Sequence, residues 1–455
     1  MGFLRLFLLT LLVLFSQSNS SLSQTPESVS PSVPRPVLAY RSDVVDLNSF
    51  SELKDFIPEE LLPDLREGSF AFRKSDELGM VFRFDKEWMN AAQGIGQFSI
   101  GTDGAIQGDG FLPNGPAFAL VLQSDAENLP ENFGQKLLWN TYSHWWRLGM
   151  LRSSFSLVNL KDERISGESH GEVARIFPSV YSEKFRQQFF RERVKLEVPE
   201  LGAELERLTF RLFGQREDTV WASSPVLFET RRIAGSNRAD PLPFAVLSLE
   251  DIFTFSGKVE IQKPSEVSSR TVFMPFAENE VVPLVKRESD SCFEVKEPES
   301  KKKGVDAQFR WNFEARTLST GAGWLPVNTT YVQRGVWRVV SLVLDPYSLE
   351  GWQVLYVDQE TLLPMYRFVF DKTGRLWKTI LSSFGLAETE DKSFRIAYPI
   401  FTAVRDHVSG QASLLNYEEF QFCPQDLADR ESEFLPSVLG PKSEVTEEGS
   451  SAKGE

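Results

Sequence analysis

Residues 352–378 constrain the fold most, because they read as three consecutive antiparallel strands. The apolar segments 352–358 and 364–370 are each followed by a turn that contains Asp, and the second turn ends with Gly374. An Asp side chain accepts hydrogen bonds from the backbone two residues on, and Gly adopts the positive φ that closes a hairpin. The pattern therefore predicts a three-strand meander.

The middle strand of this meander is apolar on both of its faces. Met365 and Val369 lie on one face, whereas Tyr366 and Phe368 lie on the other. Only Arg367 interrupts the first face. A strand with one solvated face would alternate apolar and polar residues, so we expect both faces to be covered. One cover would be the core, and the other could be a helix or a bound apolar ligand.

Other segments extend the sheet and add a few helices. Strand patterns occur at residues 208–213, 336–344 and 414–422, and helical spacing occurs at 49–66, which Pro58 divides into two short helices, and at 133–147. Regularly spaced helices between strands would be needed for a doubly wound parallel sheet, and they are missing from this pattern. The sequence predicts a mainly β, α+β fold with a large antiparallel sheet and a few covering helices.

Motifs along the chain occur in the order of a known family. They include Asp103-Gly104-Ala105-Ile106-Gln107-Gly108, then residues 134–140, residues 250–257, and Tyr356-x-Asp358-x-Glu360-Thr361 followed by Leu376-Trp377-Lys378. From about Asp46 to about Phe422 the chain resembles the bacterial domain-of-unknown-function family 1329. It departs from that pattern at residues 110–118, where a compact Gly-x-Pro-Phe-Pro motif is loosened, and at Leu362-Leu363, where an aromatic residue is expected.

The resemblance implies a fold and a function. Family members are similar in fold to the outer-membrane lipoprotein-sorting carriers, so it implies an incomplete barrel whose concave side is lined by apolar side chains and plugged by helices. It also implies association with a membrane exporter system of the cell envelope.

The two ends of the chain predict export and a tail. Residues 1–20 have the pattern of a signal peptide, with Arg5 before an apolar run at 6–15 and small-residue cleavage sites near Ser20 or Ser23. The alternative is an uncleaved anchor, although the run is short for a membrane span. We expect a flexible leader at 21–40, a single β-rich domain at 41–431 and a disordered acidic tail at 432–455.

Charge and cysteine content indicate which partners and which cellular compartment fit the protein. The net charge is −15, from 64 acidic and 49 basic residues, which disfavours nucleic acid as a partner. No later segment is long and apolar enough to span a bilayer, so we expect an exported, periplasmic protein that is not an integral membrane protein. Cys292 and Cys423 could pair in an oxidising compartment; the alternative is two unpaired buried thiols.

One string has the form of a hydrolase motif. Gly167-Glu168-Ser169-His170-Gly171 matches Gly-x-Ser-x-Gly, in which Ser169 would be the nucleophile. That motif needs a strand before it and a helix after it, and the flanking residues favour a polar turn instead. His144, His170 and His407 do not lie at ligand spacing from one another, so we predict no metal site. We also predict no cofactor and no catalysis. A secreted serine hydrolase that uses Ser169 is kept as a rival.

The aromatic content supplies candidates for a ligand site. Aromatic side chains cluster in the predicted helix and in the C-terminal strands, and the candidates for a cavity are Trp139, Tyr142, Trp146, Trp337, Tyr366, Phe368 and Trp377. An ordinary core would use such residues in the same way. We expect the meander to form one wall of an apolar cavity for a lipid or other hydrophobic molecule, with the helix as its lid. The second rival is a structural envelope protein whose sheet is simply filled.

Overall fold

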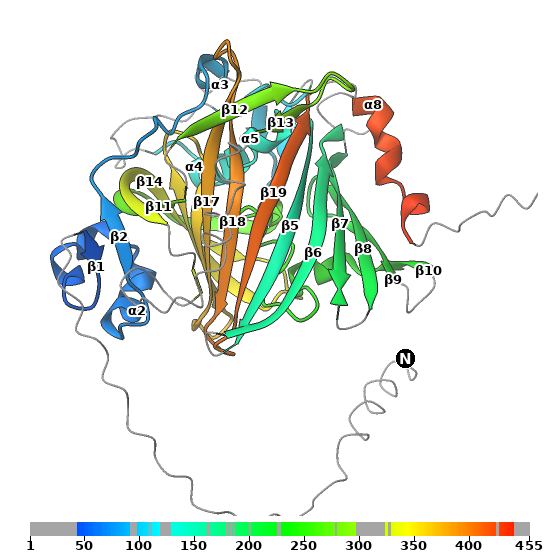
Figure 1. Ribbon diagram of the computed structural model, residues 1–455. Coiled ribbons are helices and arrows are strands. Elements are labelled where there is room, and N and C mark those ends of the chain that lie inside the picture. The colour runs from blue at the N-terminus through cyan, green and yellow to red at the C-terminus, as the bar shows by residue number, and fades with distance from the viewer. Residues whose placement is uncertain are drawn as a thin grey trace, which may run out of the picture. The chain divides into compact units, whose positions relative to one another are not determined.

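One large curved β-sheet organises the computed structural model (Figure 1). The structure describes residues 43–91, 98–108, 111–118, 129–161, 164–178, 182, 184, 187–199, 202–224, 229–277, 280–296, 324–325, 329–424 and 427–440. The chain divides into the units Met1–Tyr40 and Arg41–Glu455, and all described residues belong to the second. The predicted signal peptide and leader therefore lie outside the described residues.

Within the described ranges the large sheet has 17 strands. They are β1 (Val44–Val45), β2 (Phe72–Ser75), β5 (Met150–Lys161), β6 (Arg164–Ile176), β7 (Gln188–Val198), β8 (Ala203–Leu212), β9 (Thr219–Ser224), β10 (Glu229–Ile233), β11 (Gln262–Phe276), β12 (Val281–Lys286), β13 (Phe293–Val295), β14 (Thr330–Val343), β15 (Glu350–Asp358), β16 (Pro364–Asp371), β17 (Leu376–Glu388), β18 (Arg395–Asp406) and β19 (Ala412–Cys423). A separate hairpin consists of β3 (Phe98–Ile100) and β4 (Ile106–Gly108).

Most neighbouring strands pair antiparallel, as predicted. The continuous antiparallel order is β10, β9, β8, β7, β6, β5, β19, β18, β17, β16, β15, β14 and β11. Two short pairings are parallel, β12 with β17 and β14 with β2. Because β12 also pairs with β13 and β13 with β19, these two strands bridge β17 to β19. The predicted fold class, mainly β with a large antiparallel sheet, is confirmed.

The predicted meander is present as β15, β16 and β17. Its second turn is closed as expected, because Gly374 has φ +86° and Oδ1 of Asp371 accepts a hydrogen bond from the backbone N–H of Thr373 at 2.8 Å. Trp352 and Phe370 stack across the strand pair with ring centroids 3.6 Å apart. Local turn chemistry and cross-strand packing therefore agree in this region.

Both faces of β16 are covered by the chain itself. On one face the Arg367 guanidinium lies 2.7 Å from Asp251, in the segment that precedes β11. On the other, the Tyr366 hydroxyl donates a hydrogen bond to the carbonyl oxygen of Phe273 on β11 at 2.9 Å. Because β11 is three strands away from β16 in the ladder, this contact requires a strongly curled sheet.

Several short helices accompany the sheet. The α-helices are α2 (Leu62–Arg66), α3 (Lys86–Ala91), α4 (Phe133–Asn140), α5 (Ser143–Trp146) and α8 (Leu427–Arg430). The 3-10 helices are η1 (Phe50–Glu52), η2 (Lys54–Phe56), η3 (Glu59–Leu61), η7 (Gly235–Ala239), η8 (Val259–Ile261), η9 (Glu431–Phe434) and η10 (Pro436–Val438). The predicted helix at 133–147 is thus two helices, and the pair predicted at 49–66 is a series of shorter turns.

The α4 and α5 pair crosses the concave side from β7 to β17. Trp139 of α4 packs edge-on against Phe189 of β7 at 5.2 Å, and Trp145 of α5 lies 6.2 Å from Phe384 of β17. The break between the helices falls at Tyr142, whose hydroxyl donates to the carbonyl oxygen of Gly257 at 2.7 Å. Tertiary contacts on both sides therefore decide where the predicted single helix divides.

The ordered chain continues beyond the predicted start of the tail at Ser432. Phe434 is buried, and it packs with Leu427, Leu439 and Cys423 in a second hydrophobic cluster at the side of the sheet. The acidic composition of residues 432–455 predicted a tail, although the segment contains the apolar residues Phe434 and Leu439. Residues 441–455 lie outside the described residues.

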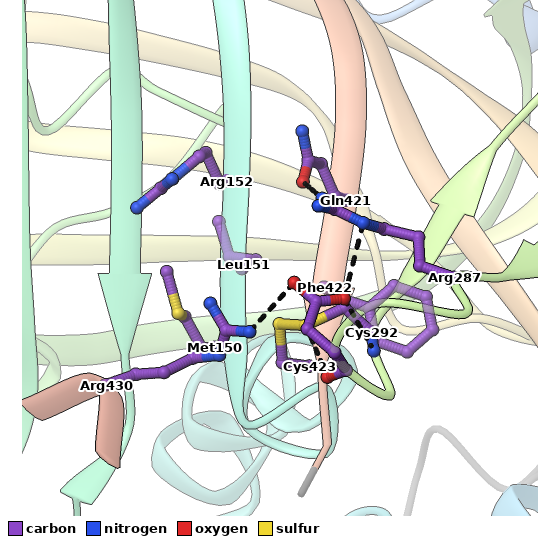
Figure 2. Close-up of a pocket in the computed structure, with 10 residues that line it drawn as sticks. Met150, Leu151, Arg152, Arg287, Cys292, Gln421, Phe422, Cys423 and Arg430 are labelled. Carbon is purple, nitrogen blue, oxygen red and sulfur yellow. Dashed lines mark hydrogen bonds and ion pairs between the residues drawn. A yellow bond between two sulfur atoms is a disulfide. The ribbon is translucent and has the colours of Figure 1, made fainter. Parts of the chain in front are cut away.

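A disulfide joins Cys292 to Cys423, which lie 131 positions apart (Figure 2). It ties the loop before β13 to the end of β19. We expect reduction to lower the free energy of unfolding by roughly 4 to 5 kcal/mol in the loop-entropy model. Mass analysis of the native protein after alkylation without reductant should find no modified thiol. Two alkylated cysteines would contradict the bridge.

Candidate functional site

The seven aromatic residues predicted to line a cavity lie in the packed core or at its border. Six are at most 2% exposed, and Trp377 is half-buried; the six are Trp139, Tyr142, Trp146, Trp337, Tyr366 and Phe368. Several of these side chains also donate hydrogen bonds to backbone carbonyl oxygens. Nε1 of Trp139 donates to the carbonyl oxygen of Gly104 at 2.9 Å, and Nε1 of Trp146 donates to that of Pro113 at 2.8 Å. In the described chain these side chains are occupied by protein contacts.

Four of these residues form two separate groups. Trp139 and Tyr142 pack on Phe189, whereas Tyr366 and Phe368 stack with centroids 6.0 Å apart. Trp337 of β14 lies edge-on to Phe133 of α4 at 5.0 Å. The five pockets described in this chain are lined by other residues. The helix pair therefore packs on the sheet where a cavity was expected.

Ser169 does not lie on a nucleophile turn. It is a buried residue in the middle of β6, where it pairs with Leu157 of β5, and β6 continues to Ile176 without a helix. Nε2 of His407 is hydrogen-bonded to the Thr379 hydroxyl at 2.8 Å. The strand, turn and helix that the hydrolase motif requires are thus replaced by a continuous strand.

His144 is a core residue of α5. Its Nε2 donates to the carbonyl oxygen of Ala397 at 2.7 Å, and its ring stacks on Phe84. Burial, together with the Arg147 charge, lowers the pKa of His144 to about 3, so the ring stays neutral. Within the described ranges, no group of three or more His, Cys, Asp or Glu side chains could hold a metal ion.

The segment at residues 248–260 lies against the concave side and holds a set of buried charges. Asp251 accepts hydrogen bonds from Arg367 of β16 at 2.7 Å and from Lys378 of β17 at 3.1 Å. Burial would raise the pKa of Asp251, but Lys378 and Arg367 together hold it below its usual value. Asp251 also accepts a hydrogen bond from the backbone N–H of Ser248 at 2.8 Å.

A second set of charges lies at the other end of the same segment. Arg175 pairs with Glu192 and donates to the Ser256 hydroxyl at 3.0 Å. Arg211 pairs with Asp218 at 2.7 Å and donates to the Ser256 carbonyl oxygen. Each cation has a carboxylate partner, so these pairs anchor the segment on β6, β7 and β8.

Where the segment enters β11, two pockets meet at Glu260. One has a volume of about 680 Å³ and the other about 380 Å³, and both are lined by Gln215, Glu260 and Leu344. We call the joined pockets the Glu260 groove. Its larger part lies beside the N-terminal end of α4, and its smaller part lies beside the β14–β15 turn.

Close packing forms the α4 wall of this groove. A Cβ atom on Gly134 would lie 2.5 Å from Cβ of Pro264, so only glycine fits at this crossing of α4 and β11. Nε2 of Gln135 donates to the carbonyl oxygen of Val259 at 2.8 Å. The predicted lid helix thus borders a pocket at its end.

The floor of the groove is polar and buried. Burial raises the pKa of Glu260 to about 7, although nearby Lys258 opposes this, and Glu260 accepts a hydrogen bond from the Gly214 N–H at 2.8 Å. Burial lowers the pKa of Lys258, which lies 3.6 Å from Asp218. Arg238 pairs with Glu250 and with Asp345 at 3.0 Å. A titratable carboxyl and two cations therefore meet at one apolar-rimmed opening, which is typical of a functional site.

Glu260, Lys258 and Arg238 are not among the site residues predicted from the sequence. Each is one charge among many, and Arg238 lies in η7, more than 100 positions from Asp345. The only local signal is that Lys258 and Glu260 directly follow the family-like motif at 250–257.

Two other hollows are weaker candidates. The pocket beside the disulfide has a volume of about 110 Å³ (Figure 2). Each arginine that lines it already has a carboxylate partner. A wider depression of about 1010 Å³ lies between β12 and the β17–β18 turn. Most of its charged lining residues, such as Glu390 and Lys392, are exposed.

Comparisons with known proteins find similarity among solved structures. No protein-family model matches the chain, and the search of curated proteins finds no match. A DUF1329 family protein from Desulfovibrio piger is 12% identical, with a TM-score of 0.43 over 69% of this chain and 100% of that chain. A putative outer membrane lipoprotein-sorting protein domain from Vibrio parahaemolyticus is 14% identical, with a TM-score of 0.38 over 61% and 88%.

A LolA superfamily protein from Nitrosomonas europaea is also similar, at 13% identity and a TM-score of 0.36 over 67% of this chain and 99% of that chain. Solved structures of family 1329 and of lipoprotein-sorting proteins, the two groups that the sequence motifs resemble, are therefore among those similar to this chain.

Glu260 should make stability depend on pH. Between its ordinary pKa of 4.5 and about 7, the folded state keeps a proton that the unfolded state releases. The free energy of unfolding should therefore fall as the pH rises through this window, by up to roughly 3 kcal/mol. Glu260→Gln should remove this contribution, which urea unfolding at several pH values would measure. An unchanged slope in the variant would contradict the assignment.

Proposed function

We propose that the protein binds and carries a lipid or another amphipathic hydrophobic molecule in the Glu260 groove, without catalysis. The observation that supports this most is that two neighbouring pockets share the buried Glu260 and the apolar Leu344 in their linings. The groove replaces the predicted cavity between meander and helix, since that space is filled by aromatic side chains.

Apolar residues in the larger part of the groove suit an acyl chain. Ile100, Leu129, Phe133 and Val267 line it, and Leu344 lies where the two parts join. Burial of an acyl chain contributes about 0.8 kcal/mol per methylene. A volume of about 680 Å³ lies within the range of small-molecule sites, so a short chain or part of a longer one would fit.

The smaller part of the groove suits a polar head group. Arg216 lines it, and the hydrogen-bond partner found for this exposed side chain is the amide oxygen of Gln187 at 2.7 Å. A carboxylate or phosphate would offer the guanidinium a charged acceptor. Protonated Glu260 could donate a hydrogen bond to the same group, because its pKa of about 7 leaves a proton available near neutral pH.

Exported location and association with a membrane exporter belong to the proposal. They rest on the signal-like residues 1–20 and on the family resemblance of the sequence motifs. None of the described helices has the length and apolar content that crossing a membrane requires.

A structural envelope protein is the second candidate. The filled concave side favours it, because the segment at 248–260 and the α4–α5 pair pack directly on the sheet. Ligand binding distinguishes the two candidates.

Filling the groove should weaken binding of a hydrophobic ligand. Gln215 is exposed and lines both parts of the groove, so Gln215→Trp places an indole at their junction. We expect the full-length protein to bind a fluorescent fatty acid and the variant to bind it at least about tenfold more weakly, as lost apolar burial requires. Titration by fluorescence would measure both affinities.

Asn48→Trp is the matched control, since Asn48 is exposed and lines none of the five pockets. It should bind as the unmodified protein does. If the unmodified protein binds neither a fatty acid nor a phospholipid probe, the carrier function is wrong and the structural candidate is preferred.

The hydrolase rival has its own test. Because Ser169 is a buried strand residue, a fluorophosphonate probe should not label it, and Ser169→Ala should leave lipid binding unchanged. Mass spectrometry of the treated protein would locate any label. A label on Ser169 that disappears in the variant would restore the hydrolase function.

A further inference from the structure

The β14–β15 turn exposes large apolar side chains beside the Glu260 groove. Leu342 is 44% exposed, Leu344 52%, Tyr347 75% and Leu349 67%. Elsewhere in the described chain no stretch of eight residues exposes more than two large apolar side chains. We call these four residues the hairpin-tip patch. Such a concentration marks an interaction surface rather than the scattered exposure of an ordinary surface.

Carboxylates near the hairpin-tip patch are already paired. Asp345 lies 3.0 Å from Arg238, and Asp371 in the neighbouring β16–β17 turn lies 2.9 Å from Arg375. Two lysines near the patch, in contrast, have no carboxylate partner among the described residues. Nζ of Lys372 donates to the carbonyl oxygen of Pro346 at 2.8 Å, and Lys263 is an exposed residue of β11 opposite Leu342.

The hairpin-tip patch lies at one end of the strands, where several turns lie together. Glu350 pairs with Asp371, Lys378 with Asp406 and Ala412 with Leu160, so the turns after β14, β16, β18 and β5 all lie at this end of the sheet. The lower ends of β18, β19 and β5 in Figure 1 belong to it. Exposed Val408 and Ile165 lie in or beside two of these turns.

We propose that the hairpin-tip patch docks the protein on a phospholipid surface. Leucine and tyrosine side chains at a turn insert among head groups and acyl chains, and the two lysines face lipid phosphates. The net charge of −15 does not prevent this, because charges farther than about 10 Å are screened at 0.1 M salt.

Docking would also place the groove against the membrane. Leu344 and Tyr347 belong to the patch and line the groove, so a lipid leaving the surface enters between them. This second step rests on the proposed function, whereas docking itself does not.

Vesicle binding tests the docking. The full-length protein is sedimented with vesicles of phosphatidylcholine and phosphatidylglycerol, and compared with a variant that combines Leu342→Thr and Leu349→Ser. Both residues are exposed and neither lines the groove. We expect binding to weaken about tenfold or more in the variant, because two inserting side chains are lost. Lys263→Ala with Lys372→Ala should weaken binding to anionic vesicles most at low salt.

The control combines Val81→Ser and Val285→Ser, two exposed apolar residues at the opposite end of the strands. The carbonyl oxygen of Val81 accepts a hydrogen bond from Arg395 at the start of β18. Val285 lies on β12, which pairs with the end of β17. This control should bind vesicles normally. Docking is wrong if the unmodified protein binds no vesicles, or if the patch variant binds them equally well. A patch variant that keeps vesicle binding but loses an envelope protein partner would assign the surface to protein recognition instead.

The two proposals fail separately. The patch variant should still bind a soluble fluorescent fatty acid, and Gln215→Trp should still bind vesicles. Vesicle binding without any fatty-acid or lipid uptake by the unmodified protein would overturn the carrier function and leave docking in place.

Discussion

The buried ion pairs of Asp251 are the contacts on which the rest of this structure depends. Asp251, Arg367 and Lys378 are all fully buried, and the carboxylate lies within hydrogen-bond distance of both cations. Loss of one partner from such a group leaves an uncompensated buried charge, which costs about 3–5 kcal/mol. Because Asp251 lies in the segment at 248–260 and its partners lie on β16 and β17, these pairs hold that segment on the concave side of the sheet.

Holding this segment in place determines what the interior can contain. Phe253 and Thr254 have φ values of 57° and 71°, a conformation that costs free energy for residues other than glycine. Packing maintains it, since Phe253 stacks on Trp145 at 4.4 Å and its N–H donates to the Tyr417 hydroxyl. The side chains of this segment fill the space that a concave sheet would offer to a ligand. Open space remains in the Glu260 groove, which lies where the segment enters β11.

The position of the Glu260 groove beside the β14–β15 turn connects the proposed lipid binding with the proposed membrane docking. At Glu260 the chain leaves the packed interior, and burial there raises the pKa of one carboxyl while the neighbouring hollow stays open. The β14–β15 turn projects beside this opening and exposes Leu344 and Tyr347. A site that receives an amphipathic molecule from a lipid surface needs an apolar rim and a polar floor, and both occur here within a few residues.

Sequence alone determined the features that depend on neighbouring residues. The turn at Asp371 and Gly374, the strands of the meander and the coverage of both faces of β16 follow from local turn chemistry and side-chain alternation. The tertiary structure decided what covers those faces and where a hollow remains. Asp251 meets Arg367 across 116 positions and Lys378 across 127, and such pairings leave no periodic trace in a sequence. Aromatic residues predict a large apolar volume, but whether protein or ligand fills it depends on long-range packing, which only the folded chain specifies.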